Sequence, residues 1–170
     1  RRMKAFRIPL ALFALLSPAA HAEWGEFDHE FEADKPWVEI AATLPAAPRD
    51  ADLLEFSVSS VAPHRYFIDG ASLSVGADQV VRYTVVVQTA GGAKNVFFEG
   101  MRCETAERRL YAVGQPDGAW TRARDPAWKP IALRSGLAYH KALYEDAFCP
   151  DAVRVRDAKA AIANLKTRAR

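Results

Sequence analysis

The chain has 170 residues, half of them hydrophobic, and its 23 basic and 21 acidic side chains give a formal net charge of +2. This length is typical of one domain with an adequate core. The near balance of charge gives no indication of nucleic acid or a strongly anionic surface as a partner.

The first 22 residues have the three-part order of a secretory signal peptide. A basic segment, RRMKAFR, precedes the apolar run IPLALFALLSPA, and the small residues Ala20 and Ala22 suit cleavage after Ala22. The apolar run is short, because a membrane-spanning helix needs roughly 20 apolar residues. We therefore expect a periplasmic protein with no transmembrane segment after cleavage. Secretion from the cell and association with the outer membrane are the alternative locations. No cysteine stands at the cleavage point, so a lipid anchor is not expected.

Cleavage makes the remaining chain acidic. It removes four basic residues and no acid, so the formal net charge falls from +2 to −2. Residues 23–36 hold six carboxylates without a hydrophobic period, which is typical of a flexible acidic leader. His29 lies among these acids, but no second histidine stands at ligand spacing, so we expect no metal site there.

The chain has two cysteines, Cys103 and Cys149. An even count in an exported chain favours a disulfide. Such a bond would close a loop of about 45 residues and stabilise the fold by roughly 4 kcal/mol in the chain-entropy model. Two buried free thiols are the alternative. A redox-active pair is not expected, because the sequence has no C-x-x-C motif.

Residues 37–150 are predicted to form one α+β core domain. The proline-rich start of this range keeps the backbone extended until the first strand. Short apolar runs then alternate with turn residues at Asp69-Gly70, at positions 76–78, at Gly91-Gly92 and at positions 116–118. This pattern predicts an antiparallel sheet of about five or six strands.

One predicted strand, VVRYTVVVQ, alternates in a way that predicts its environment. Val81, Tyr83, Val85 and Val87 share one face, whereas Arg82, Thr84, Val86 and Gln88 share the other. We therefore expect this strand to be packed on one side and half covered on the other.

The apolar period becomes helical near the end of the chain. GLAYHKALYEDAF predicts a helix that ends at Cys149, and Pro150 separates it from a basic helix within residues 151–170. The second helix has a narrow apolar stripe made of Val155, Ala158, Ile162 and Leu165. One or two C-terminal helices should thus pack across the sheet. Whether the basic helix packs on the core, contacts anionic lipid or closes on the acidic leader stays open, and we expect the core to fold when residues 152–170 are deleted.

Four stretches resemble a known family. They are DKPWVE, RYFIDGASLSVGADQVVRYTVVVQTAGGAKNVFFEGMRC, RRLYAVGQPDGAWTRARDPAW and YHKALYEDAFCPDAVRVRDAKAAIANL. Over roughly residues 36–166 they look like the cryptic neisserial protein family of small exported proteobacterial proteins. The resemblance implies an uncharacterised exported domain and transfers no activity, cofactor or catalytic residue. The layout alone is also similar to the surface-adhesin E family, whose members bind host proteins.

Several residues could form a site, and each also has a purely structural interpretation. His140 and Asp146 share a predicted helix, with His64, Tyr139 and Tyr144 as further polar candidates. A nucleophilic triad would need a serine or cysteine against the imidazole, and no G-x-S-x-G motif supplies one.

Charged and aromatic residues on the predicted strands offer a second possibility. Glu99, Arg102, Arg108 and Arg109 could line an anion site or form cross-strand ion pairs. Tyr111, Trp120 and Trp128 could stack a sugar or fasten a loop to the core.

These patterns favour an exported envelope protein that acts through surface contacts and is not an enzyme. An adhesin-like or small-ligand-binding domain is the alternative, and a hydrolase is a third possibility. We assign no catalytic, cofactor-binding or metal-binding residue and no cofactor, and the sequence does not identify a partner. Cys103 and Cys149 are the only residues to which a specific role, the disulfide, is assigned.

Overall fold

A computed structural model describes residues 36–134 and 139–168. The predicted signal peptide, almost all of the acidic leader and the start of the first predicted helix lie outside the described residues. Residues from Trp37 onward belong to one compact unit. Within the described part of this unit, no helix is long and apolar enough to cross a membrane.

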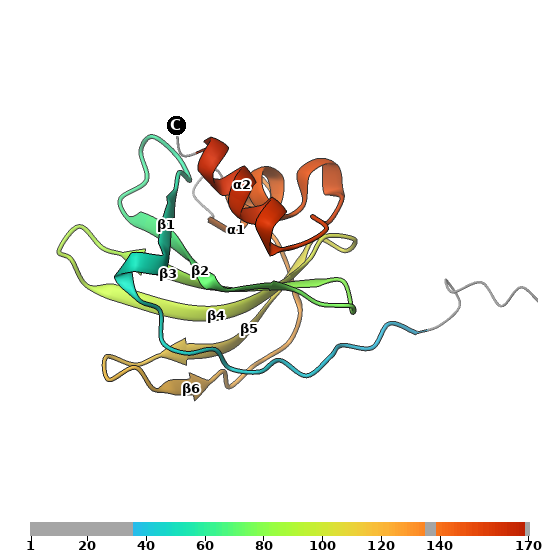
Figure 1. Cartoon of the computed structure of the whole chain (residues 1–170), viewed down its shortest axis with the longest axis horizontal. Coiled ribbons are helices and arrows are strands. Elements are labelled where there is room, and N and C mark those ends of the chain that lie inside the picture. The colour runs from blue at the N-terminus through green and yellow to red at the C-terminus, as the bar shows by residue number, and fades with distance from the viewer. Residues whose placement is uncertain (1–35, 135–138, 169–170) are drawn as a thin grey trace, which may run out of the picture. The chain divides into compact units, whose positions relative to one another are not determined.

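The strands form one antiparallel sheet in which neighbours in sequence are neighbours in space (Figure 1). They are β1 (Leu53–Phe56), β2 (Arg65–Val75), β3 (Val80–Gln88), β4 (Lys94–Arg102), β5 (Glu107–Gly114), β6 (Trp120–Arg122) and β7 (Lys129–Pro130). The first six follow one another across the sheet, and β7 pairs with β5. The predicted antiparallel sheet is confirmed.

Three of the predicted turns lie between strands, but the one at Asp69-Gly70 is wrong. Gly92 and Gly118 have φ angles of +87° and +85° in their turns, a conformation that glycine adopts without strain. Asp69 instead lies within β2, where the register with β3 shifts between Asp69 and Ser74. Its side chain accepts the backbone N–H of Ala71 at 3.1 Å, so a turn-like local bond produces a bulge inside a strand.

Helical segments cover one face of the sheet (Figure 1). They are α1 (Tyr139–Ala142), the π-helical segment η3 (Leu143–Phe148), the single turn η4 (Pro150–Ala152) and α2 (Ala158–Arg168), and a further single turn, η2 (Asp50–Asp52), precedes β1. The predicted break at Pro150 is observed. The basic helix begins at Ala158, later than its apolar stripe suggested. Residues 153–157, which include Val155 of that stripe, are not helical.

The core lies between the sheet and these helices. Val81, Tyr83, Val85 and Val87 all belong to it, as their alternation predicted. Ala161 and Leu165 of α2 are 0% and 2% exposed within the same cluster. The question left open by the sequence is therefore answered, and α2 is part of the core. This reverses the expectation that residues 152–170 can be deleted without unfolding the core.

The opposite face of the sheet is covered by an extended segment, residues 37–48, which we call the strap (Figure 1). Arg82, Thr84 and Val86 are at most 7% exposed on this face. The expectation of a half-covered face is therefore wrong, because the strap and its contacts exclude water from it. Leu44 of the strap packs on a second apolar cluster that contains Phe98.

Cys103 and Cys149 form a disulfide with a Cα–Cα distance of 5.4 Å. The bond joins the turn after β4 to the residue after η3. Tyr144 supports this junction by donating its hydroxyl to the carbonyl oxygen of Cys103 at 3.0 Å. The predicted disulfide is confirmed, and it fastens the helical layer to one end of a hairpin.

Replacing either cysteine should destabilise the protein equally. Cys103→Ser and Cys149→Ser each open the same loop, so each should lower the free energy of unfolding by about 2–4 kcal/mol, and the double variant should lose little more. Urea unfolding with and without reductant measures this. Reduced wild-type protein that is as stable as the oxidised form would contradict the prediction.

Leu165→Ala should cost about 2–5 kcal/mol, because it leaves a cavity in the core between α2 and the sheet. The neighbouring Lys166 is exposed, and Lys166→Ala is the matched control, expected within about 0.5 kcal/mol of wild type. Thermal and urea unfolding compare the two. Equal effects of the two substitutions would mean that α2 does not stabilise the core.

Candidate binding site at the strap

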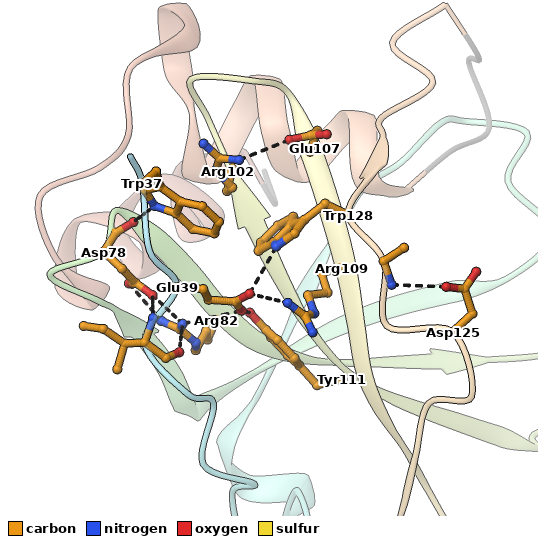
Figure 2. A network of polar contacts seen from close by, with 12 residues as sticks. Trp37, Glu39, Asp78, Arg82, Arg102, Glu107, Arg109, Tyr111, Asp125 and Trp128 are labelled. Atoms are coloured by element: carbon orange, nitrogen blue, oxygen red, sulfur yellow. Dashed lines mark hydrogen bonds and ion pairs between the residues drawn. The ribbon is translucent and has the colours of Figure 1, made fainter. Parts of the chain in front are cut away.

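Glu39 is the centre of a polar network between the strap and the sheet (Figure 2). Its carboxylate accepts hydrogen bonds from the Arg109 guanidinium, from the Tyr111 hydroxyl at 2.6 Å and from the Trp128 indole at 3.1 Å. The Arg82 guanidinium lies 3.8 Å away. The side chain of Glu39 is only 14% exposed, so donors from three directions replace its water.

A buried ion pair lies beside this centre. Arg82 donates to both carboxylate oxygens of Asp78, at 3.1 and 2.6 Å, and the two side chains are 8% and 1% exposed. Burial alone would raise the pKa of Asp78, but the Arg82 guanidinium and the N–H groups of Ile40 and Val80 stabilise the carboxylate, and the pKa is lowered. The pair also binds the strap, because Asp78 accepts the Ile40 N–H and Arg82 donates to the Ile40 carbonyl oxygen.

Aromatic side chains close one end of the network (Figure 2). Trp37 and Trp128 meet edge to face with their ring centroids 5.9 Å apart. The Arg102 guanidinium lies 3.8 Å from the centroid of Trp37 and also pairs with Glu107. Trp37 donates its indole N–H to the backbone carbonyl oxygen of Asp78 at 2.7 Å. The first residues of the strap are therefore fixed by stacking and hydrogen bonds together.

An open cavity of about 500 Å³ adjoins Glu39, and we call it the strap cavity. Its lining residues come from the strap, from β5 and from the segment around β6: Glu39, Ala41, Ala42, Arg109, Tyr111, Arg122, Ala123 and Pro126. The walls therefore combine two guanidinium groups, one phenol and one carboxylate with small apolar side chains.

The strap cavity has guanidinium donors that the protein does not use. Arg109 uses one terminal nitrogen for Glu39, and its Nε is buried without a partner. Arg122 is exposed and makes no ion pair within the described residues. Burial and the hydrogen bond to Glu39 raise the pKa of Tyr111, so its hydroxyl keeps its proton and donates. Glu39 already accepts three hydrogen bonds and Tyr111 has donated its one proton to it, so the guanidinium groups of Arg109 and Arg122 are the donors left for an anion.

The four charged residues on the adjacent strands do not form one site. Alternate residues of a strand point to opposite faces, so Glu99 lies on the helical side, whereas Arg102 and Arg109 reach the strap. Arg108 pairs across the sheet with Met101, a core residue on the helical side, so Arg108 belongs to the face of Glu99. A single anion site made of all four residues is therefore wrong, because they lie on two faces, and the alternative of cross-strand ion pairing is observed for Arg102, which pairs with Glu107 on β5.

Glu99 forms a separate buried cluster under the helices. Its oxygens accept the hydroxyls of Tyr83 and Tyr139, each at 3.0 Å, and the His140 Nε2 lies at 2.9 Å. Burial and then the charge of Glu99 raise the pKa values of both tyrosines well above the usual range. The cluster ties the start of the helical layer to the sheet.

The remaining candidates are structural or peripheral in the described chain. His140 bonds Glu99, Tyr144 bonds the carbonyl of Cys103, and His64 is exposed with its ring beside Tyr66. Trp120 donates to the carbonyl oxygen of Pro45 at 2.8 Å. The tryptophans and Tyr111 therefore fasten a segment to the core, which was one of their two interpretations.

Sequence reasoning missed Trp37, Glu39, Asp78 and Arg122. The alternation in WVEI was a usable signal, since the side chains of Trp37 and Glu39 bond groups of the sheet side, whereas Val38 and Ile40 are 76% and 51% exposed. Their partners lie 41 and 72 residues away, however, and no local pattern identifies them.

A family model described as the CNP1-like family matches residues 32–166, a range that includes the strap, the sheet and most of α2. The chain belongs to the CNP1-like family. This is a family of uncharacterised proteins, as the resemblance of the sequence indicated, and it assigns no role to the strap cavity. Neither the curated proteins nor the solved structures include a match to this chain.

The Asp78–Arg82 pair should make stability depend on pH in the acid range. The pKa of Asp78 is lowered in the folded state, so its contribution is complete above the ordinary value of 3.8 and is lost as the pH falls through the lowered pKa. Asp78→Asn should cost about 3–5 kcal/mol at neutral pH, because Arg82 stays buried without its partner.

The same variant should also lose less stability than wild type between about pH 4 and pH 2, as measured by urea unfolding at each pH. Asp50→Asn is the matched control, since that carboxylate is 82% exposed in its pair with Lys94. An acid dependence of Asp78→Asn as steep as that of wild type would contradict the assignment.

Proposed function

We propose that this protein is an exported component of the bacterial envelope that acts by binding, and that the strap cavity holds a small organic anion. The observation that carries the proposal is the pair Arg109 and Arg122 in one cavity whose single carboxylate, Glu39, already accepts three hydrogen bonds. An anion would supply the acceptor that Arg122 lacks within the described residues, and a second acceptor for the Arg109 guanidinium, which bonds only Glu39 there.

The walls indicate what else the ligand contains. Ala41, Ala42, Ala123 and Pro126 present small apolar surfaces, so a ligand with a carbon skeleton gains more than a bare inorganic ion. A volume of about 500 Å³ lies within the usual range for small-molecule sites. A carboxylate on a compact apolar body matches both properties.

Export and binding without catalysis are supported by separate features. The first 22 residues have the order that is typical of a signal for export, and a disulfide would be stable in the oxidising periplasm. His140 is only 12% exposed and is bonded to Glu99, so it is poorly placed to act on a substrate. Binding is therefore favoured over hydrolysis.

Adhesin-like surface contact is a second candidate, favoured by exposed apolar side chains of the strap. Val38 is 76% and Ile40 51% exposed, and both alternate with the buried Glu39. A protein partner would cover them. Replacing both with serine would then abolish capture of that partner and leave anion binding in the strap cavity unchanged.

Benzoate and its neutral analogue benzamide test the anion site. In NMR titrations of the full mature chain, benzoate should shift the Trp128 indole signal, because that group donates to Glu39 beside the cavity, and benzamide should not. Arg122→Gln should weaken benzoate binding at least about tenfold, since a hydrogen bond between charged groups is worth roughly 1.5–3 kcal/mol.

Arg124→Gln is the matched control, because Arg124 is also exposed but does not line the cavity. It should bind benzoate like wild type. Equal affinity of the Arg122 and Arg124 variants, or no response of wild type to benzoate, would overturn the proposal.

A further inference from the structure

A second cavity, of about 330 Å³, lies beside the disulfide, and we call it the disulfide-side cavity. Its lining comes from the first strap residue, the turn between β2 and β3, the end of β4 and the segment after η4: Trp37, Gln79, Arg102, Cys103, Glu104, Ala152, Val153 and Arg154. It shares no lining residue with the strap cavity.

The walls of this cavity are fixed by direct contacts. Arg154 donates its Nε to the side-chain oxygen of Gln79 at 2.8 Å and its Nη1 to the carbonyl oxygen of Val155 at 2.8 Å. Trp37 is held by its indole bond to Asp78 and by the Arg102 guanidinium over its ring. A ligand would therefore meet groups that are already ordered, which lowers the entropy cost of binding.

Left-handed backbone conformations gather at the same place. Four non-glycine residues of the described chain have positive φ angles, and Gln79, Asp151 and Ala152 are three of them, at 68°, 56° and 61°. Gln79 and Ala152 line the cavity, and Asp151 precedes Ala152. Such conformations cost energy for residues with a Cβ, and their concentration at one cavity is typical of a functional site.

Two of the three charged residues that line the cavity, Glu104 and Arg154, have no oppositely charged partner within the described residues, whereas Arg102 is paired with Glu107. Glu104 is exposed, and Arg154 bonds uncharged groups. The same cavity is lined by two apolar side chains, Trp37 at 37% and Val153 at 67% exposure. A simple anion would be repelled by Glu104 and a simple cation by Arg154, so neither suits the cavity alone.

We propose that the disulfide-side cavity binds a free α-amino acid with an aliphatic side chain. The carboxylate of the ligand would pair with Arg154, its ammonium group with Glu104, and its side chain would pack on Trp37 and Val153. The small volume fits a single amino acid and not a longer peptide. This inference does not depend on the anion site in the strap cavity.

Three probes that differ only in charge test the ligand class. L-leucine carries both charges, 4-methylpentanoate lacks the ammonium group, and 3-methylbutylamine lacks the carboxylate. Titration of the full mature chain, followed by calorimetry and by the NMR signal of the Trp37 indole, should show leucine binding at least about tenfold more tightly than either analogue. Binding of 4-methylpentanoate as tight as that of leucine would overturn the role of Glu104.

Two substitutions then separate the charges. Arg154→Gln should weaken the binding of both leucine and 4-methylpentanoate at least about tenfold. Glu104→Gln should weaken the binding of leucine and leave the binding of 4-methylpentanoate unchanged. Arg156→Gln and Glu145→Gln are the matched controls, because both residues are exposed and neither lines the cavity. Arg154→Gln loses the bond to Gln79 and could therefore disturb the local fold. Glu104 is exposed, so Glu104→Gln keeps the fold and tests the inference independently.

Arg122→Gln, which disables the strap cavity, should leave leucine binding unchanged, so failure of one site is distinguishable from failure of the other. No response of wild-type protein to leucine at millimolar concentration would overturn the inference. So would equal affinity of the Arg154 variant and its control.

Discussion

The buried pair of Arg82 and Asp78 is the constraint on which the strap side of the molecule depends. Arg82 lies in β3, near the centre of the sheet, where its charge has no access to bulk water. Asp78 neutralises it, and the two residues together bond both the N–H and the carbonyl of Ile40. A buried charge without a partner is strongly unfavourable, so the ion pair and the position of the strap stabilise each other.

The position of the strap in turn creates both cavities. Trp37 forms a wall of the disulfide-side cavity and touches Trp128, which donates to Glu39 in the wall of the strap cavity. The two cavities are thus connected by three side chains in contact. The strap pairs with no strand of the described sheet and is held by bonds to side chains. Its small residues can therefore line a cavity, since its backbone is not engaged in strand pairing.

Local patterns predicted much of the fold because they report on burial. The alternation in β3 identified the four side chains that enter the core, and the change of period after residue 135 identified the helical layer. The turn predicted at Asp69-Gly70 was wrong because the local hydrogen bond that makes a turn can also make a bulge within a long strand. The narrow apolar stripe of α2 led to the wrong prediction that the core folds without this helix. Alanine needs little space, so two buried residues suffice to pack the helix on the core.

The sequence by itself determined the antiparallel sheet, the C-terminal helices and the disulfide. Each follows from short-range periodicity or from having a single possible partner. Only the tertiary structure decided the two cavities and the groups that line them. Glu39 meets Arg109, Tyr111 and Trp128 across 70 to 89 residues of chain, and it meets them because the strap crosses the far face of the sheet. The periodicity of a strand predicts which of its residues face inward, but not which segment covers them. The covering segment depends on which distant groups can neutralise a buried charge.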